Sequence, residues 1–187
     1  MSDDERFRAS GWRGREVRIP RPAGTPGPVV LEFKGGVTTS FQLYAGKRTA
    51  TYRSYGEQLL RTGGPRARRV LVPSHCNHVG VHRISPGRNV GTGFARWRLR
   101  AVDTAELPVL TDTLSGKCED VVFFDRPARF SFAWDGSLAN GRLYFTRADG
   151  GEARAVGLEG VFRGVTVVPG GGFLSVSVSE PWTLKRL

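Results

Sequence analysis

Apolar residues in this chain alternate with polar ones in short runs, and no window of helical length carries an apolar residue at every third or fourth position. Alternation with a period of two is typical of a strand that buries one face. Residues 31–33, 41–43, 143–145 and 174–178 follow this pattern, and glycine-rich turns separate such runs. The sequence therefore predicts an all-β protein with no substantial helix.

The two halves of the chain repeat one another. The matching segments keep their order at nearly constant spacing: residues 30–33 with 121–124, 40–41 with 131–132, Arg53 and Gly56 with Arg147 and Gly150, 72–73 with 168–169, and 97–100 with 182–185. This is typical of a duplicated unit of about 70 residues. A unit of that size is marginal alone, so we expect two β-sandwich or jelly-roll-like units packed together.

These patterns predict four segments. Residues 1–27 are rich in arginine and proline, and we expect them to form an extended arm with little to bury. The first β unit is predicted over 28–102, a linker over 103–118 and the second β unit over 119–187. Trp97 and Trp182 occupy matched positions in the two units and are predicted core residues.

The last third of the chain resembles an uncharacterised bacterial β-sandwich repeat. The residues that carry this resemblance are Asp135-Gly-Ser-Leu-Ala-Asn140, Leu158-Glu-Gly160, Phe162-Arg-Gly164, Pro169-Gly-Gly-Gly172 and the closing Trp182-Thr-Leu184. They combine a glycine-rich turn, an alternating strand and a final Trp-x-Leu. The resemblance implies a sandwich fold and implies no activity.

Positive charge is concentrated in the first half. The chain has a net charge of +11, and residues 46–100 hold twelve Lys or Arg against one acid, Glu57. Residues 103–187 instead hold nine basic and eleven acidic residues. A coding bias towards arginine would load both halves alike. The asymmetry therefore favours an acidic partner for the first unit.

The candidate binding surface for such a partner is a basic stretch with interleaved aromatic residues. Tyr44, Tyr52 and Tyr55 lie among the cations, a mixture that suits single-stranded nucleic acid. An acidic protein is the other candidate partner. A solvated face whose arginines pair with carboxylates of the same chain or of a second subunit is the alternative without an outside partner. The candidate residues are Lys47, Arg48, Arg53, Arg66, Arg68, Arg69, Arg83, Arg88, His78 and His82.

All three histidines fall within residues 75–82, together with Cys76. If this segment is a strand, Val79 and Val81 face the core, whereas Cys76, His78 and His82 share the outer face. That set could bind zinc or copper. However, His78 and His82 are four strand residues apart, which is far for one ion, so we expect no cofactor. The imidazoles would then hydrogen-bond a ligand or titrate near pH 6.5.

An enzyme centred on Cys76 with His75 or His78 is a further alternative. Neighbouring strand residues point to opposite faces, and no orienting acid accompanies the pair. No secretory signal is visible at the start, and two cysteines make no disulfide framework, so a cytoplasmic location is expected. The sequence thus favours a non-enzymatic cytoplasmic protein that binds a polyanion. One alternative is an assembly subunit that docks an acidic protein or, as a homo-oligomer, another copy of itself. The other is a metal- or cysteine-dependent enzyme.

Overall fold

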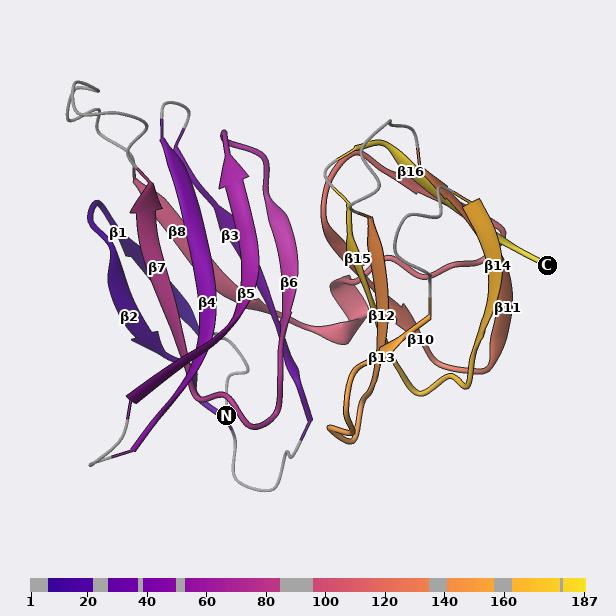
Figure 1. Ribbon diagram of the computed structural model, residues 1–187, viewed down its shortest axis with the longest axis horizontal. Helices are drawn as coiled ribbons and strands as arrows, with labels where there is room; N and C mark the ends of the chain where they lie inside the picture. The colour runs from indigo at the N-terminus through magenta and orange to yellow at the C-terminus, as the bar shows by residue number, and fades with distance from the viewer. Residues whose placement is uncertain are drawn as a thin grey trace. The chain divides into compact units, whose positions relative to one another are not determined.

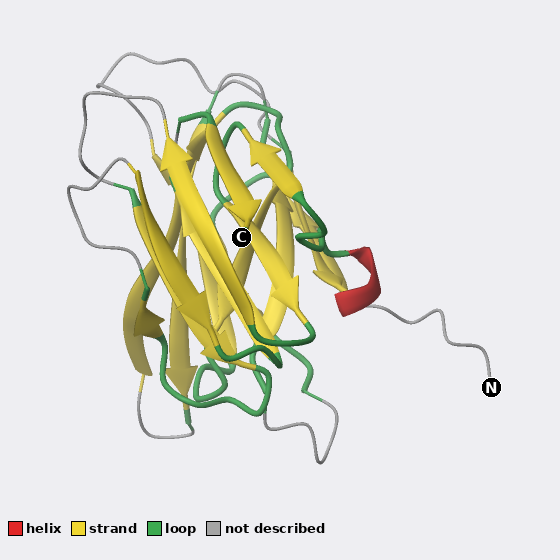
Figure 2. Ribbon diagram, turned by 90° about the vertical axis from the view of Figure 1, so that its right-hand side faces the viewer, coloured by secondary structure: helices red, strands yellow, loops and turns green. Residues whose placement is uncertain are grey.

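The computed structural model describes residues 7–21, 27–36, 39–49, 53–84, 96–134, 141–156, 163–178 and 180–187, and its strands form two units. Figure 1 shows the first unit in indigo to magenta and the second in pink through orange to yellow. Among the described residues the one helix is a single 3₁₀ turn, Thr104–Glu106, which is red in Figure 2. The prediction of an all-β chain is confirmed.

The first unit is a sandwich of two four-stranded antiparallel sheets, ordered β1-β8-β3-β6 and β2-β7-β4-β5. Leu31, Phe33 and Trp97 from one sheet pack with Phe41 and Leu43 from the other in a single buried cluster. The strands are β1 (Arg8–Gly11), β2 (Arg15–Arg18), β3 (Val29–Lys34), β4 (Ser40–Arg48), β5 (Arg53–Gly63), β6 (Arg68–Val72), β7 (His78–Ile84) and β8 (Trp97–Val102).

The second unit is built in the same way. Its sheets are ordered β14-β11-β16-β9 and β10-β15-β12-β13, and its core includes Phe130, Phe132, Leu174 and Trp182. The strands are β9 (Thr113–Gly116), β10 (Asp120–Phe124), β11 (Ala128–Trp134), β12 (Arg142–Arg147), β13 (Arg154–Ala155), β14 (Arg163–Val168), β15 (Gly172–Ser177) and β16 (Trp182–Arg186).

Each strand of the first unit has its counterpart eight strands later. Adding eight to every strand in the order β1-β8-β3-β6 gives β9-β16-β11-β14, and adding eight to β2-β7-β4-β5 gives β10-β15-β12-β13. The register also matches, because Val17 pairs with Val79 where Val122 pairs with Leu174. The duplication therefore covers eight strands in each unit, and both predicted core tryptophans are buried.

The predicted arm and linker are corrected by this correspondence. Residues 8–11 and 15–18 form β1 and β2, which are edge strands of the first unit, and residues 113–116 form β9 in the second. Beyond β2, Arg21 donates hydrogen bonds to the carbonyls of Pro73 (2.6 Å) and Cys76 (2.9 Å). The segment therefore pairs with the sheets through its backbone, and its Val17 and Ile19 lie in the core. Its many arginines and prolines led to the incorrect prediction of an arm.

The predicted alignment of the halves was therefore right only in part. Trp97 with Trp182 and Val72 with Val168 are equivalent positions, as predicted. Residues 30–33 instead match β11 rather than 121–124, and β4 matches β12 rather than residues 131–132. Arg53 lies in β5 and Arg147 in β12, so these two are not equivalent either. The predicted arm left β1 and β2 out of the first unit, and the predicted linker left β9 out of the second. This part of the alignment was therefore displaced by one strand.

Candidate functional site

The predicted cationic residues do not form one surface. His78 and His82 project from the outer face of the β2-β7-β4-β5 sheet, because they alternate with buried valines of β7. Arg48 lies on the same face, since it continues the outward series of alternate β4 residues that includes Gln42 and Tyr44. Arg69 lies on the other sheet, paired with Glu32. A sandwich turns these two outer faces in opposite directions. An extended ligand that lies flat on one face cannot contact both sets.

The remaining predicted cations are scattered. Arg66 is exposed in the turn before β6. Lys47 shares its side of β4 with buried Ala45, while Arg68 and Arg83 are half-buried and pair with the core residues Phe33 and Phe41. Lys47, Arg68 and Arg83 therefore lie at the ends of the core-facing side of their strands. The prediction that they belong to an outer binding surface is wrong. Arg88 and Tyr52 lie outside the described part of the chain. So do the side chains of Arg53 and Tyr55.

One end of the outer face of β1-β8-β3-β6 gathers cations from four strands. Arg8 lies opposite Arg100, Arg100 opposite Glu32, and Glu32 opposite Arg69, so these four form one row across the sheet. In the adjacent row Arg98 lies opposite Lys34. We call Arg8, Lys34, Arg69, Arg98 and Arg100 the cationic face. Among the described residues of this sheet face, Glu32 is the one acid.

Glu32 neutralises only part of this charge. Its carboxylate accepts a hydrogen bond from Arg100 Nε at 2.9 Å, and Arg69 Nε lies 3.9 Å from its other oxygen. With the described residues, Arg8, Lys34 and Arg98 form no ion pair. All three are exposed. The face thus has a centre where a half-buried carboxylate contacts two guanidinium groups, and a margin of cations that are open to solvent.

Two like-charged pairs are directly opposed on this face: Arg8 with Arg100, and Arg98 with Lys34. Like charges directly opposite each other on neighbouring strands destabilise a sheet. The counterparts of these four residues in the second unit are Thr113, Lys185, Thr183 and Ala133. That sheet has the same fold without either repulsive pair. The fold therefore does not require the cations.

The sequence contained a signal for this face that the prediction did not use. In residues 96–100 arginine alternates with Trp97 and Leu99, which are both buried, so Arg98 and Arg100 must point outward. Arg8 was missed because its segment was interpreted as an arm. Lys34 was missed because it follows the apolar run of β3, next to the turn at residues 35–36. Only Arg69 belongs to both the predicted set and the cationic face.

The opposite sheet holds a polar network around Asn77. The Asn77 side chain accepts a hydrogen bond from the Arg48 backbone N–H and donates one to the Arg48 carbonyl, both at 2.9 Å. These two bonds fix which amide atom is the oxygen. Since His78 Nδ1 lies 2.7 Å from that oxygen, it must be the protonated nitrogen, which leaves Nε2 as an acceptor in the neutral ring.

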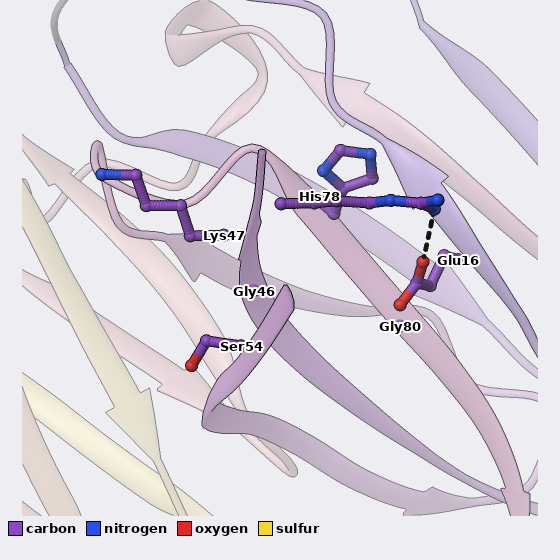
Figure 3. A pocket seen from close by; sticks show the side chains of 7 residues that line it. Glu16, Gly46, Lys47, Ser54, His78 and Gly80 are labelled. Carbon is purple, nitrogen blue, oxygen red and sulfur yellow. Dashed lines mark hydrogen bonds and ion pairs between the residues drawn. The ribbon is translucent and has the colours of Figure 1, made fainter. Parts of the chain in front are cut away.

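A small, open hollow lies beside this network, lined in part by Gly46, Gly80 and His78. Figure 3 shows Glu16, Lys47 and His78 around it, with the dashed line marking the ion pair between Glu16 and Arg48 at 3.1 Å. Burial lowers the pKa of His78, Glu16 opposes this shift, and Arg48 and Arg18 add to it. This shift favours the neutral form of His78 at pH 7.

His82 lies further along the same face of β7. Its ring meets the ring of Tyr44 edge-on, with the centroids 5.4 Å apart. The hydroxyl of Tyr44 in turn donates to Gln42 at 3.0 Å. The predicted outward position of His78 and His82 is thus confirmed, but the surface around them is a mixed network of polar groups with an internal ion pair.

The predicted metal set of Cys76, His78 and His82 is not assembled. Cys76 precedes β7 and its side chain lies in the hydrophobic core of the first unit, whereas the two histidines project outward. Its position in the 73–77 turn, outside the strand, removes the alternation on which the prediction depended. Within the described part of the chain, no three His, Cys, Asp or Glu side chains are close enough to share a metal ion.

Burial also bears on the predicted cysteine nucleophile. Cys76 is 3% exposed, and burial raises the pKa of its thiol, against the opposing influence of Arg21. A nucleophilic cysteine needs the thiolate form and access to solvent. The environment of Cys76 provides neither. Cys118, the second free thiol, is half-buried in the other unit.

Comparison with known proteins identifies no family. No family model matches the chain, and no curated protein matches it. The resemblance of the last third to a bacterial repeat therefore stays a prediction. Within the described residues no helix is long and apolar enough to cross a bilayer.

Two solved structures are distantly similar. A protein from Eubacterium rectale whose secretion is inferred has 9% identity and a TM-score of 0.28, over 96% of this chain and 67% of that one. The CUB1-EGF-CUB2 segment of human MASP-1/3 has 11% identity and a TM-score of 0.24, over 93% and 99%. With TM-scores this low, neither likeness bears on the function of this chain.

Proposed function

We propose that this protein is a non-enzymatic, cytoplasmic nucleic-acid-binding protein, and that the cationic face of its first unit contacts backbone phosphates. The observation that carries the proposal is the pair of directly opposed like charges, Arg8 with Arg100 and Arg98 with Lys34. An arrangement that destabilises the free sheet is relieved when an anion lies between the opposed cations. The equivalent sheet of the second unit folds without it.

The spacing of the cations suits a ladder of phosphates. Neighbouring strands are about 4.8 Å apart, and outward residues of one strand about 7 Å apart, so Arg8, Arg100 and Arg98 follow one another at these intervals. Glu32 lies between Arg100 and Arg69 in the same row. Four of the five cations of the face are arginines, whose planar groups can hold a phosphate by two hydrogen bonds. A polymer with regularly repeated phosphates can contact several of them at once.

The face favours duplex nucleic acid over single strands. Its described residues include no aromatic side chain, so it offers no platform for base stacking. Contacts to phosphates alone position a protein without reading sequence. We therefore propose binding that is independent of sequence and depends strongly on salt. Both cysteines are free, which suits the reducing cytoplasm proposed as the location.

The test is fluorescence anisotropy with labelled duplex DNA between about 50 and 200 mM salt. The variant Arg8→Thr/Lys34→Ala/Arg98→Thr replaces three exposed cations with the residues of the second unit. It should bind at least about tenfold more weakly and lose about three units from the slope of log affinity against log salt. The matched control removes three exposed cations of the second unit, Lys117, Arg126 and Arg154, with the same change in net charge.

Two results would overturn the proposal. If the control variant weakened binding as much as the cationic-face variant, total charge rather than this face would be responsible. If polyglutamate bound the wild-type protein as tightly as DNA does at the same salt, the partner would be an acidic protein instead.

A further inference from the structure

Edge strands of a sheet expose unpaired backbone groups, and proteins usually protect them with charge, short length or a covering segment. Most of the edge strands here are protected in these ways. In the first unit β1, β2, β5 and β6 all carry arginine. In the second unit β9 and β13 have only four and two residues. Along β10, Phe123 N–H donates to the Pro108 carbonyl, and Val109 forms a bridge with Phe123.

β14 has the least protection of these edge strands. It is the edge of the sheet β14-β11-β16-β9, and no described strand pairs with its other side. After Arg163 it continues as Gly-Val-Thr-Val-Val without a charge. Val165 and Val167 point to the outer face and are 54% and 62% exposed, although valine is a residue that strands normally bury. Two of the most exposed large apolar side chains of the described chain thus adjoin on one open edge.

The same position in the first unit shows what protection would look like. There, β6 has Arg69 where β14 has Val165, since Arg69 pairs with Glu32 and Val165 with the equivalent Ser131. One copy of the duplicated edge carries a guanidinium group and the other an exposed valine. The difference lies at the outer surface, so packing of the core does not explain it.

We infer that β14 is the surface through which two copies of this chain associate, by antiparallel pairing of β14 with its counterpart. A two-fold axis at Thr166 places Val165 of each copy opposite Val167 of the other, the kind of cross-strand β-branched pair that stabilises sheets. In this register Arg163 of one copy lies opposite Pro169 of the other. No like charges are opposed.

Charge favours a second copy as the partner. Residues 103–187 hold nearly balanced charge, nine basic and eleven acidic residues, so two second units can approach without strong repulsion. The edge strands of the first unit concentrate arginine, and β6 paired with itself would bring four guanidinium groups together. Pairing through β14 would also join two cationic faces in one particle, which raises avidity for a polymer if the proposed function holds.

Light scattering coupled to size-exclusion chromatography, up to millimolar protein and without nucleic acid, tests this inference. We expect a species of twice the 20.5 kDa chain mass. It should be more populated at about 200 mM than at about 50 mM salt, because salt screens the overall positive charge. The variant Val165→Arg/Val167→Arg should raise the dimer dissociation constant at least about tenfold.

The control is Val109→Arg, at another exposed valine of the same unit, which should leave the dimer unchanged. Circular dichroism and the urea midpoint should be measured to check that both variants fold; at Val165 we expect arginine to be tolerated because the first unit has Arg69 at the equivalent position. A wild-type monomer at every concentration would overturn the inference, as would a dimer that persists in the double variant. Because the assay contains no polyanion, its outcome is separate from that of the proposed function.

Discussion

Gly11 lies directly opposite Trp97 on the neighbouring strand, and the indole of Trp97 occupies the space that a side chain at Gly11 would need. The indole N–H donates to the Arg13 carbonyl at 2.9 Å. Gly116 and Trp182 repeat this arrangement in the second unit, with a bond of 2.7 Å to the Cys118 carbonyl. In each unit the first strand, β1 or β9, thus packs against a tryptophan of the last strand, β8 or β16. The glycine makes this close approach possible.

Replacing Gly11 by alanine tests this relationship. The added Cβ would lie 2.8 Å from Trp97 Cζ2, so the indole or the β1 backbone must move, and we expect a loss of about 1–3 kcal/mol in the free energy of unfolding. Urea denaturation provides the measurement. Gly151→Ala is the control, because its nearest neighbour would be Arg147 Cδ at 3.5 Å. Equal effects of the two substitutions would show that the contact with Trp97 is unimportant.

Much of the fold could be predicted from the sequence, because it depends on local patterns. Alternation marked the strands around Phe41, Leu143 and Leu174, and the repeated Trp-x-Leu located the closing strand of each unit. The first strands were missed for a physical reason. β1 and β2 are held in place partly by backbone pairing with β8 and β7, and pairing between distant segments leaves little trace in composition.

The like-charged pairs predict that stability and binding change in opposite directions. Arg98→Thr introduces the residue of the equivalent position, Thr183, and removes the repulsion from Lys34. We expect the free energy of unfolding to rise by about 0.2–1 kcal/mol while DNA binding weakens. Urea denaturation at low salt, where repulsion is least screened, makes the comparison. A variant that is less stable than the wild type would show that Arg98 has a structural role.

His78 should make the folded state less stable in acid. Burial holds its pKa below the ordinary 6.5 in the folded state, so the unfolded chain takes up the proton first as the pH falls through about 6.5. Stability is therefore lost as the pH decreases from there, until the pH lies below the folded-state pKa. In His78→Gln, urea midpoints at neutral and mildly acidic pH should differ less than in the wild type.

His82→Gln serves as the control for His78, since it lies on the same face of the same strand and is exposed. If His78→Gln kept the full pH dependence of the wild-type protein, other groups would have to account for it.

Cys76 should resist thiol reagents until the first unit unfolds. In a Cys118→Ser background it is the one thiol, and burial keeps it protonated and covered. We expect its reaction with an aromatic disulfide at neutral pH to be at least about a hundredfold slower than in the urea-unfolded chain. If Cys76 reacted with the disulfide under native conditions as fast as in the unfolded chain, it would again be a candidate nucleophile.

The binding site was less predictable than the fold. The charge asymmetry indicated the first unit, but the sequence could not show which cations share a face. Arg48 and Arg69 are both outward residues of the basic stretch and yet lie on opposite sheets, and Arg8 joins Arg100 only because β1 pairs with β8. Membership of a sheet face depends on strand order, which only the folded chain reveals.

Glu32 offers the most direct test of the cationic face, because its carboxylate should oppose the binding of a polyanion. In Glu32→Gln the contacts with Arg69 and Arg100 lose the negative charge of the carboxylate, so the cationic face as a whole becomes more positive. We predict that the affinity for duplex DNA at low salt rises about threefold to tenfold, with a steeper salt dependence. An unchanged or weaker affinity in a folded Glu32→Gln protein would contradict the account.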